Sequence, residues 1–192
     1  LSPEASTYSQ CNIFFDQRKV ARYVSMNLPS DYILIVKEHP SQYVSSDGRG
    51  EDYYKEILSH KNIYFANPQD KAIDLINKAE FIITSTGSVG IEAILMEKPL
   101  IMLGNNHYEI FEDILKAKDY NTLKDKINLL VNKNVKIEKE KILKFLHCYK
   151  KSFYPGNIEI FFKKKILKKE EYNLELNKIS VSFSNILNKL YK

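Results

Sequence analysis

The stretch that decides the fold runs from Phe81 to Tyr108 and reads FIITSTGSVGIEAILMEKPLIMLGNNHY. It contains two short apolar runs, at residues 81–84 and 99–103, of the kind expected for strands buried on both faces of a parallel sheet. Between these runs a hydroxyl-rich turn opens a largely apolar helix that carries one charge, Glu92, in its middle. The stretch therefore predicts a strand, a turn, a short helix and a second strand.

The turn is a candidate phosphate site. It consists of Ser85, Thr86, Gly87 and Ser88. A turn that feeds a helix offers free backbone N–H groups, hydroxyl donors and the positive end of the helix dipole. The alternative is that Ser85 and Thr86 only cap the helix and that Gly87 eases the turn.

A second stretch points to the same edge of the sheet. Residues 32–36 (YILIV) predict a strand, which runs directly into Lys37, Glu38, His39 and Pro40. Ligands of open α/β sheets bind beyond the carboxyl ends of the strands. We therefore expect Lys37 and His39 to share a crevice with the turn at residues 85–88.

The two stretches together resemble a known family. VKEHPS at residues 36–41 and TSTGSVGIEAILMEKPLIMLG at residues 84–104 resemble the donor-binding half of bacterial capsule and surface-polysaccharide glycosyltransferases of the GT-B type, including Kdo-transferring capsular polysaccharide biosynthesis proteins. The His-Pro and Ser/Thr motifs are more distantly similar to those of bacterial sialyltransferases and polysialyltransferases, and there is a distant likeness to teichoic-acid polymerases. The resemblance covers about residues 1–115.

The predicted fold is α/β. The resemblance implies a Rossmann-like, doubly wound parallel sheet that forms one half of a GT-B fold, and strands and helices alternate every ten to fifteen residues as that fold requires. We expect a nucleotide-sugar-binding domain over residues 1–115 and a helical C-terminal extension over residues 116–192. The alternation is expected to end after Tyr108, which either walls the cleft or belongs to the core. The extension predicts helices over residues 121–131, 137–151, 157–169 and 170–191.

Three polar residues are expected to cap helices: Asp16, Asp70 and Asn121. A further helix is predicted over residues 51–60, with Tyr54, Ile57 and Leu58 pointing inward.

Two side chains are candidates for the leaving phosphate of a nucleotide sugar. Metal-independent transferases stabilise that phosphate with basic side chains, hydroxyls and helix N-termini. His39 is expected to hydrogen-bond to the phosphate, with Lys37 adding a point charge, and Arg49 is a candidate second contact. The alternatives are a structural His-Pro turn for His39, a surface ion pair for Lys37 and a solvated loop position for Arg49.

Other positions suit the nucleoside. Glu92 lies in the first turns of its helix, where its carboxylate can accept hydrogen bonds from both ribose hydroxyls, and the resemblance supports that role. Its alternative is a carboxylate that only complements the helix dipole. Asn67 ends another predicted strand and is expected at the base pocket on position alone.

Some chemistry is missing from the sequence. It contains neither a DxD pair after an apolar strand nor a GxGxxG fingerprint, which disfavours a metal-dependent transferase and an oxidoreductase. We therefore expect no metal and no tightly bound cofactor, with a nucleotide sugar as substrate. No residue is a good candidate for the catalytic base. The GT-B plan places the base on an N-terminal domain, which we expect as a partner, together with a saccharide or lipid-linked acceptor.

Composition suggests the compartment and the surface. The chain has 192 residues with 44% hydrophobic and 28% charged residues, and Cys11 and Cys148 lack metal or redox spacing, so a cytoplasmic location is expected. Residues 1–115 carry a net charge of −6 and residues 116–192 a net charge of +11. The basic helices predict either peripheral contact with the inner face of a membrane or a solvated Lys-rich face. The chain has three Arg, none in these basic runs, which argues against nucleic acid.

Three functions fit the sequence. The first is the donor half of a glycosyltransferase for capsule or surface polysaccharide, with a CMP-activated acidic sugar favoured over a UDP-sugar by the His-Pro and Ser/Thr motifs. The second is a sugar-nucleotide epimerase of the UDP-N-acetylglucosamine 2-epimerase kind, which would need carboxylates in the sugar crevice, where Glu38 and Glu92 are the candidates. The third is a non-catalytic scaffold of a capsule assembly complex.

Overall fold

The computed structural model describes residues 10–39, 49–133, 135–152 and 169–190. Contacts divide the chain into two compact units, Leu1–Leu143 and Lys144–Lys192. The helix predicted over residues 157–169 lies outside the described residues except for its last position.

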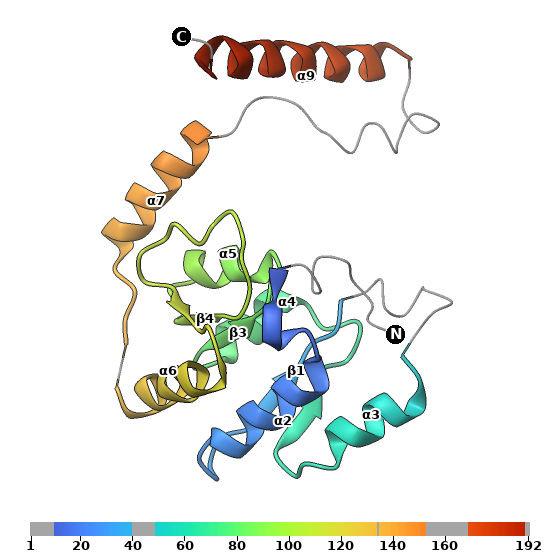
Figure 1. Ribbon diagram of the computed structural model, residues 1–192, viewed down its shortest axis with the longest axis vertical. Helices are drawn as coiled ribbons and strands as arrows, with labels where there is room; N and C mark the ends of the chain where they lie inside the picture. Colours follow the sequence, from blue (N-terminus) through green and yellow to red (C-terminus); the bar gives the residue numbers. More distant parts are fainter. Residues whose placement is uncertain (1–9, 40–48, 134, 153–168, 191–192) are drawn as a thin grey trace. The chain divides into compact units, whose positions relative to one another are not determined.

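The first unit alternates strands and helices, as the sequence predicted (Figure 1). Its elements are η1 (Asn12–Phe14), α2 (Gln17–Asn27), β1 (Leu34–Val36), α3 (Glu51–Leu58), β2 (Ile63–Phe65), α4 (Ala72–Lys78), β3 (Ile82–Thr84), α5 (Val89–Leu95), β4 (Leu100–Met102), β5 (Leu115–Lys116) and α6 (Tyr120–Asn132). Helix α7 (Lys139–Ser152) crosses the boundary between the units, and α9 (Lys169–Leu190) belongs to the second.

The strands form two parallel ladders. β1 pairs with β2, with Leu34 opposite Ile63, and β4 pairs with both β3 and β5. Apolar packing joins the ladders, because Leu34 of β1 contacts the same core cluster as Phe81 and Ile83 at β3. β1 and β3 thus lie at the middle of the strand order, with β2 beyond β1 and with β4 and β5 beyond β3. The predicted α/β fold with a parallel, Rossmann-like sheet is confirmed.

Helices cover both faces of these strands (Figure 1). Helices α2, α3 and α6 pack together on one face, and α4 and α5 pack together on the other. This arrangement follows from the strand order: parallel crossovers are right-handed, so connections that run in opposite directions along a sheet place their helices on opposite faces. The connections β1–α3–β2 and β2–α4–β3 run in opposite directions.

Helix α6 contributes to the core of the first unit. Its residues Leu123 and Ile127 are fully buried and belong to the same cluster as Phe14, Val24 and Ile101. The predicted boundary after residue 115, with a helical extension that packs on the sheet domain, stays a prediction; the contacts of the structure place α6 in the first unit, which ends at Leu143.

Local sequence signals predicted one helix start well and two others less well. Asp16 caps α2, with its side chain accepting from the backbone N–H of Arg18 at 3.1 Å. Helix α6 begins with a capping box at Asp119 rather than with Asn121. The prediction that Asp70 caps α4 is wrong, because its carboxylate instead accepts from the backbone N–H of Asn67 at 2.9 Å and closes the preceding turn.

Two further expectations are corrected. The alternation does not end after Tyr108, because β5 adds a short parallel strand beyond β4. Helix α3 does bury Ile57, but Leu58, which was expected to point inward, is 51% exposed. Adjacent residues of a helix are about 100° apart, and the sheet-facing direction is already occupied by Ile57.

The second unit contains the long helix α9. Leu174, Val181 and Phe183 on this helix are exposed. Among the described residues, no helix combines the length and the apolar character needed to cross a bilayer.

The burial of α6 leads to a testable expectation. Ile127→Ala should lower the free energy of unfolding by about 2–5 kcal/mol, because it leaves a cavity in the core. The neighbouring exposed Asn128→Ala should change it by less than about 0.5 kcal/mol. Urea denaturation followed by circular dichroism measures both. Equal, small effects would contradict the placement of α6 in the core of the first unit.

Candidate functional site

The predicted site residues lie after the carboxyl ends of the strands in the first unit. Lys37 and His39 follow β1, and the turn at residues 85–88 follows β3. Because β1 and β3 flank the point where the chain order reverses, their carboxyl ends define the place where open α/β sheets bind ligands.

Lys37 links the ends of β1 and β2. Its Nζ donates to the carbonyl oxygen of Pro68 at 3.2 Å, so the side chain crosses to the loop after β2. In that loop the Oδ1 of Asn67 accepts from the backbone N–H of Gln69 at 2.9 Å. The amide oxygen of Asn67 therefore stabilises its own turn. His39, on the loop after β1, is exposed.

The loop after β4 holds the turn at residues 85–88 in place. The Nδ2 of Asn106 donates to the carbonyl oxygen of Thr86, and the hydroxyl of the fully buried Tyr108 donates to that of Gly87 at 2.6 Å. Two successive carbonyl groups of the turn thus point toward the loop after β4.

The carbonyl contacts also orient the amides of the turn. In a planar trans peptide the N–H points opposite to the C=O of the same unit. The N–H groups of Gly87 and Ser88 therefore point away from Asn106 and Tyr108. Gly87 and Ser88 are both exposed. Within the described part of the chain, neither amide donates a hydrogen bond.

Two glycines make this close packing feasible. A Cβ atom on Gly90 would lie 2.6 Å from Cζ of Tyr108, and one on Gly104 would lie 2.9 Å from the carbonyl oxygen of Ser85. Both distances are below normal contact. Tyr108, which the sequence left open as a cleft wall or a core residue, is a core residue that locks the turn.

A buried ion pair lies directly beside His39. The carboxylate of Glu38 is 1% exposed and accepts from Nη1 of Arg49 and, at 2.8 Å, from the hydroxyl of Tyr54. The Arg49 side chain is 7% exposed. Its nearest partners are therefore protein groups, and its predicted role as a phosphate contact stays a prediction.

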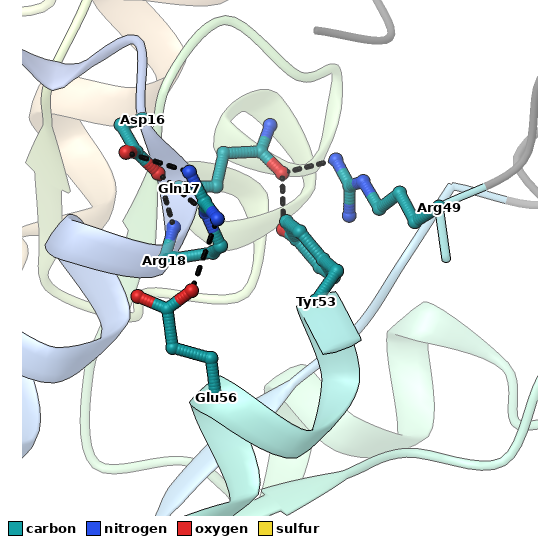
Figure 2. A network of polar contacts seen from close by, with 6 residues as sticks. All are labelled: Asp16, Gln17, Arg18, Arg49, Tyr53 and Glu56. Carbon is teal, nitrogen blue, oxygen red and sulfur yellow. Dashed lines mark hydrogen bonds and ion pairs between the residues drawn. The ribbon is translucent and has the colours of Figure 1, made fainter. Parts of the chain in front are cut away.

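The guanidinium of Arg49 also reaches the start of α2. Its Nη2 donates to Oε1 of Gln17, and its Cζ lies 4.4 Å from the ring centroid of Tyr53 (Figure 2). Its Nε has no hydrogen-bond partner among the residues that the structure describes. Burial raises the pKa of Tyr53 to about 12, so its phenol stays protonated at neutral pH and can donate to the same oxygen of Gln17, at 3.4 Å.

Arg18 continues this network at the surface. It bonds to Asp16, the N-cap of its own helix, at 3.2 Å and to Glu56 of α3 at 3.0 Å (Figure 2). The start of α2 is thus joined by a buried contact to Arg49, just before α3, and by a more exposed contact through Arg18 to the C-terminal half of α3.

Glu92 lies on α5 behind the turn. It is half-buried, and in the described part of the chain its carboxylate has no ion-pair or hydrogen-bond partner. The described residues also contain no group of three or more His, Cys, Asp or Glu side chains that could hold a metal ion.

Sequence reasoning missed the residues that support the site. Gln17, Asn106 and Tyr54 act through partners that are distant in the sequence, and no local pattern marks such partners. For Tyr108 a signal existed: an aromatic residue shortly after a strand, with Gly90 on the neighbouring helix to make room for it.

Fold and site define the chain as a Rossmann-like α/β protein with polar loops gathered at the carboxyl ends of its parallel strands. A family model described as "Capsule polysaccharide biosynthesis protein" matches residues 15–112, just over half of the chain. The chain therefore belongs to the capsule polysaccharide biosynthesis protein family.

One curated relative supports this assignment. The chain is 32% identical over 91 residues to "Protein FixF" of Sinorhizobium fredii (strain NBRC 101917 / NGR234). The matched segment is 47% of this chain and 21% of that protein, so the match spans about a fifth of the relative's length. No solved structure matches the chain.

The glycine contacts give a test of how the turn is held. Gly90→Ala should destabilise the protein by about 1–3 kcal/mol, because the added methyl group forces the buried Tyr108 ring to move. Gly50→Ala, where a Cβ meets nothing within 4 Å, should change stability by less than about 1 kcal/mol. Thermal denaturation of both variants measures the difference, and a Gly90→Ala variant as stable as Gly50→Ala would show that Tyr108 is loosely packed.

Proposed function

We propose that this chain is the donor-binding half of a metal-independent glycosyltransferase that builds capsule or surface polysaccharide. The observation that carries the proposal is the arrangement at the β1 and β3 ends: Lys37 and His39 after one strand and a hydroxyl-rich turn after the other, in a chain of the capsule family. The donor is a nucleotide sugar, with a CMP-activated acidic sugar favoured and a UDP-sugar second.

The proposed chemistry is stabilisation of the leaving phosphate. Negative charge grows on that phosphate as the glycosidic bond to it breaks, and preorganised donors lower the barrier. His39 and Lys37 supply basic groups, and Ser85, Thr86 and the outward amides of Gly87 and Ser88 supply neutral donors. Glu92 takes the ribose hydroxyls, which fits a half-buried carboxylate that lacks a partner among the described residues, and Asn67 lies toward the base.

The catalytic base and the acceptor site belong to a further, N-terminal domain of the GT-B plan. The acceptor is a saccharide or a lipid-linked saccharide. The basic C-terminal helices provide peripheral contact with the membrane at which such acceptors are held. On this proposal the chain binds donor without turning it over.

The epimerase alternative is weakened by the state of Glu38. An epimerase would need carboxylates free to exchange protons with the sugar, but the carboxylate of Glu38 is buried and paired with Arg49 and Tyr54. Glu92 alone would remain for that role.

Calorimetric titration with CMP, CDP and UDP tests the proposal. Specific binding of cytidine nucleotides supports a CMP-sugar transferase, and specific binding of uridine nucleotides supports a UDP-sugar donor. If none of the three nucleotides binds, the donor-binding proposal is wrong and a scaffold role in capsule assembly takes its place.

His39 provides a first mutational prediction. His39→Ala should weaken nucleotide binding by about 1.5–3 kcal/mol, the value of a charge-assisted hydrogen bond. It should leave the melting temperature nearly unchanged, because His39 is exposed on a loop. His60→Ala, at the opposite edge of the sheet before β2, is the matched control and should leave binding unchanged. A lower melting temperature with intact binding would mean that His39 is structural.

Variants of Glu92 and Ser85 should distinguish binding of the ribose from binding of the phosphates. Glu92→Gln should weaken nucleotide binding by about 1–3 kcal/mol, because a charged acceptor becomes a neutral one, and should leave inorganic pyrophosphate unaffected. Ser85→Ala should weaken both ligands alike. Equal loss of both ligands in Glu92→Gln would refute the ribose assignment.

A further inference from the structure

Glu38 stands between the two basic residues that the proposed function uses, and it points the other way. The side chain of Lys37 reaches the carbonyl oxygen of Pro68, whereas the side chain of Glu38 reaches Arg49 and Tyr54. Successive side chains of an extended chain alternate between its two sides. Accordingly Glu38 is buried and its neighbour His39 is exposed.

The anchors of Glu38 come from two elements. Tyr54 lies within α3, and Arg49 lies just before that helix and is itself held by Gln17 at the start of α2. The segment that leaves β1 is therefore tied at Glu38 to the beginnings of both helices on that face of the sheet.

The pairing of Glu38 with Arg49 carries a large desolvation cost, so stability alone does not explain it. Moving a carboxylate and a guanidinium out of water costs several kcal/mol per ion, and well-packed apolar residues of similar volume often stabilise a fold equally well or better. In the described part of the chain, Nε of Arg49 also has no hydrogen-bond partner. Beyond stability, the pair fixes the orientation of the Glu38 side chain, because hydrogen bonds between charged groups have a specific geometry.

We infer that Glu38 is a positioning residue: its buried carboxylate, held by Arg49 and Tyr54, turns His39 toward the proposed donor phosphate. The inference takes its ligand from the proposed function, whereas the contacts of Glu38 come from the structure itself. Arg49 then acts as the partner that fixes Glu38, and the negative charge of Glu38 is compensated within the protein.

A double-mutant cycle tests the inference. Calorimetry measures CMP binding to the wild type, Glu38→Gln, His39→Ala and the double variant. If Glu38 acts through His39, Glu38→Gln should weaken binding about tenfold in the wild type, as expected when a hydrogen bond from His39 to a charged group is largely lost. In the His39→Ala background it should have almost no effect, since residues that act together are not additive. Equal factors in both backgrounds would overturn the inference.

A second readout does not depend on nucleotide binding. In the ligand-free protein, the imidazole signals of His39, assigned by comparison with His39→Ala, should move in Glu38→Gln. If no nucleotide binds the wild type, the proposed function is wrong, and this displacement still decides whether Glu38 orients His39. Unchanged imidazole signals would overturn the positioning role.

Two variants guard against simple unfolding. Tyr54→Phe removes only the hydroxyl that donates to Glu38, so it should fold and move the His39 signals in the same direction by a smaller amount. Glu56→Gln removes the exposed partner of Arg18 in the neighbouring contact and should move neither the signals nor the affinity. An effect of Glu56→Gln equal to that of Tyr54→Phe would contradict a specific role for Glu38.

Discussion

The structure depends on the apolar contact that joins the two ladders. Backbone hydrogen bonds hold β1 to β2 and β4 to both β3 and β5, whereas the two ladders are joined by apolar packing: Leu34 of β1 and Phe81 and Ile83 at β3 pack against the same buried cluster. That shared cluster helps to fix the segment after Val36 relative to the segment after Thr84. A two-stranded ladder of three residues each is also too small to be stable alone.

The two loops at this edge are fixed by different physical means. The turn at residues 85–88 is held by neutral hydrogen bonds from a buried tyrosine and an asparagine, in a space that two glycines keep open. The segment after β1 is held by a buried charge pair. The neutral hydrogen bonds go to carbonyl groups of the turn and leave Gly87 and Ser88 exposed. A charge pair suits a segment that carries basic side chains, because it compensates the carboxylate between them.

Sequence reasoning recovered what local signals encode. Asp16 caps its helix because a cap needs only the next few residues, and the apolar runs at β1, β3 and β4 mark buried parallel strands. Strand β5 was missed because two residues, Leu115 and Lys116, become a strand only by pairing with β4. Asp70 was read as a cap because its hydrogen-bond partner in the preceding turn could not be distinguished from a helix N–H.

The sequence predicted where the candidate site lies but not which residues hold its side chains in position. The edge at which Lys37, His39 and the turn lie follows from strand order, so position in the sequence was sufficient. The partners of Glu38 could not be predicted in the same way. Tyr54 is 16 residues away, and Gln17 meets Arg49 across 32 residues. Such contacts exist only once α2, α3 and β1 have packed.

The charges next to His39 and Lys37, and not the net charge of residues 1–115, decide whether an anion binds at the carboxyl ends of β1 and β3. Residues 1–115 carry a net charge of −6, so their long-range field does not attract a nucleotide sugar. Screening at physiological ionic strength reduces such fields beyond about 8 Å. Within that distance of a phosphate held near His39 and Lys37, an uncompensated carboxylate would oppose binding. Glu38 is the carboxylate that the sequence places between these residues, and its pairing with Arg49 removes that opposition while keeping the geometry that a carboxylate can fix.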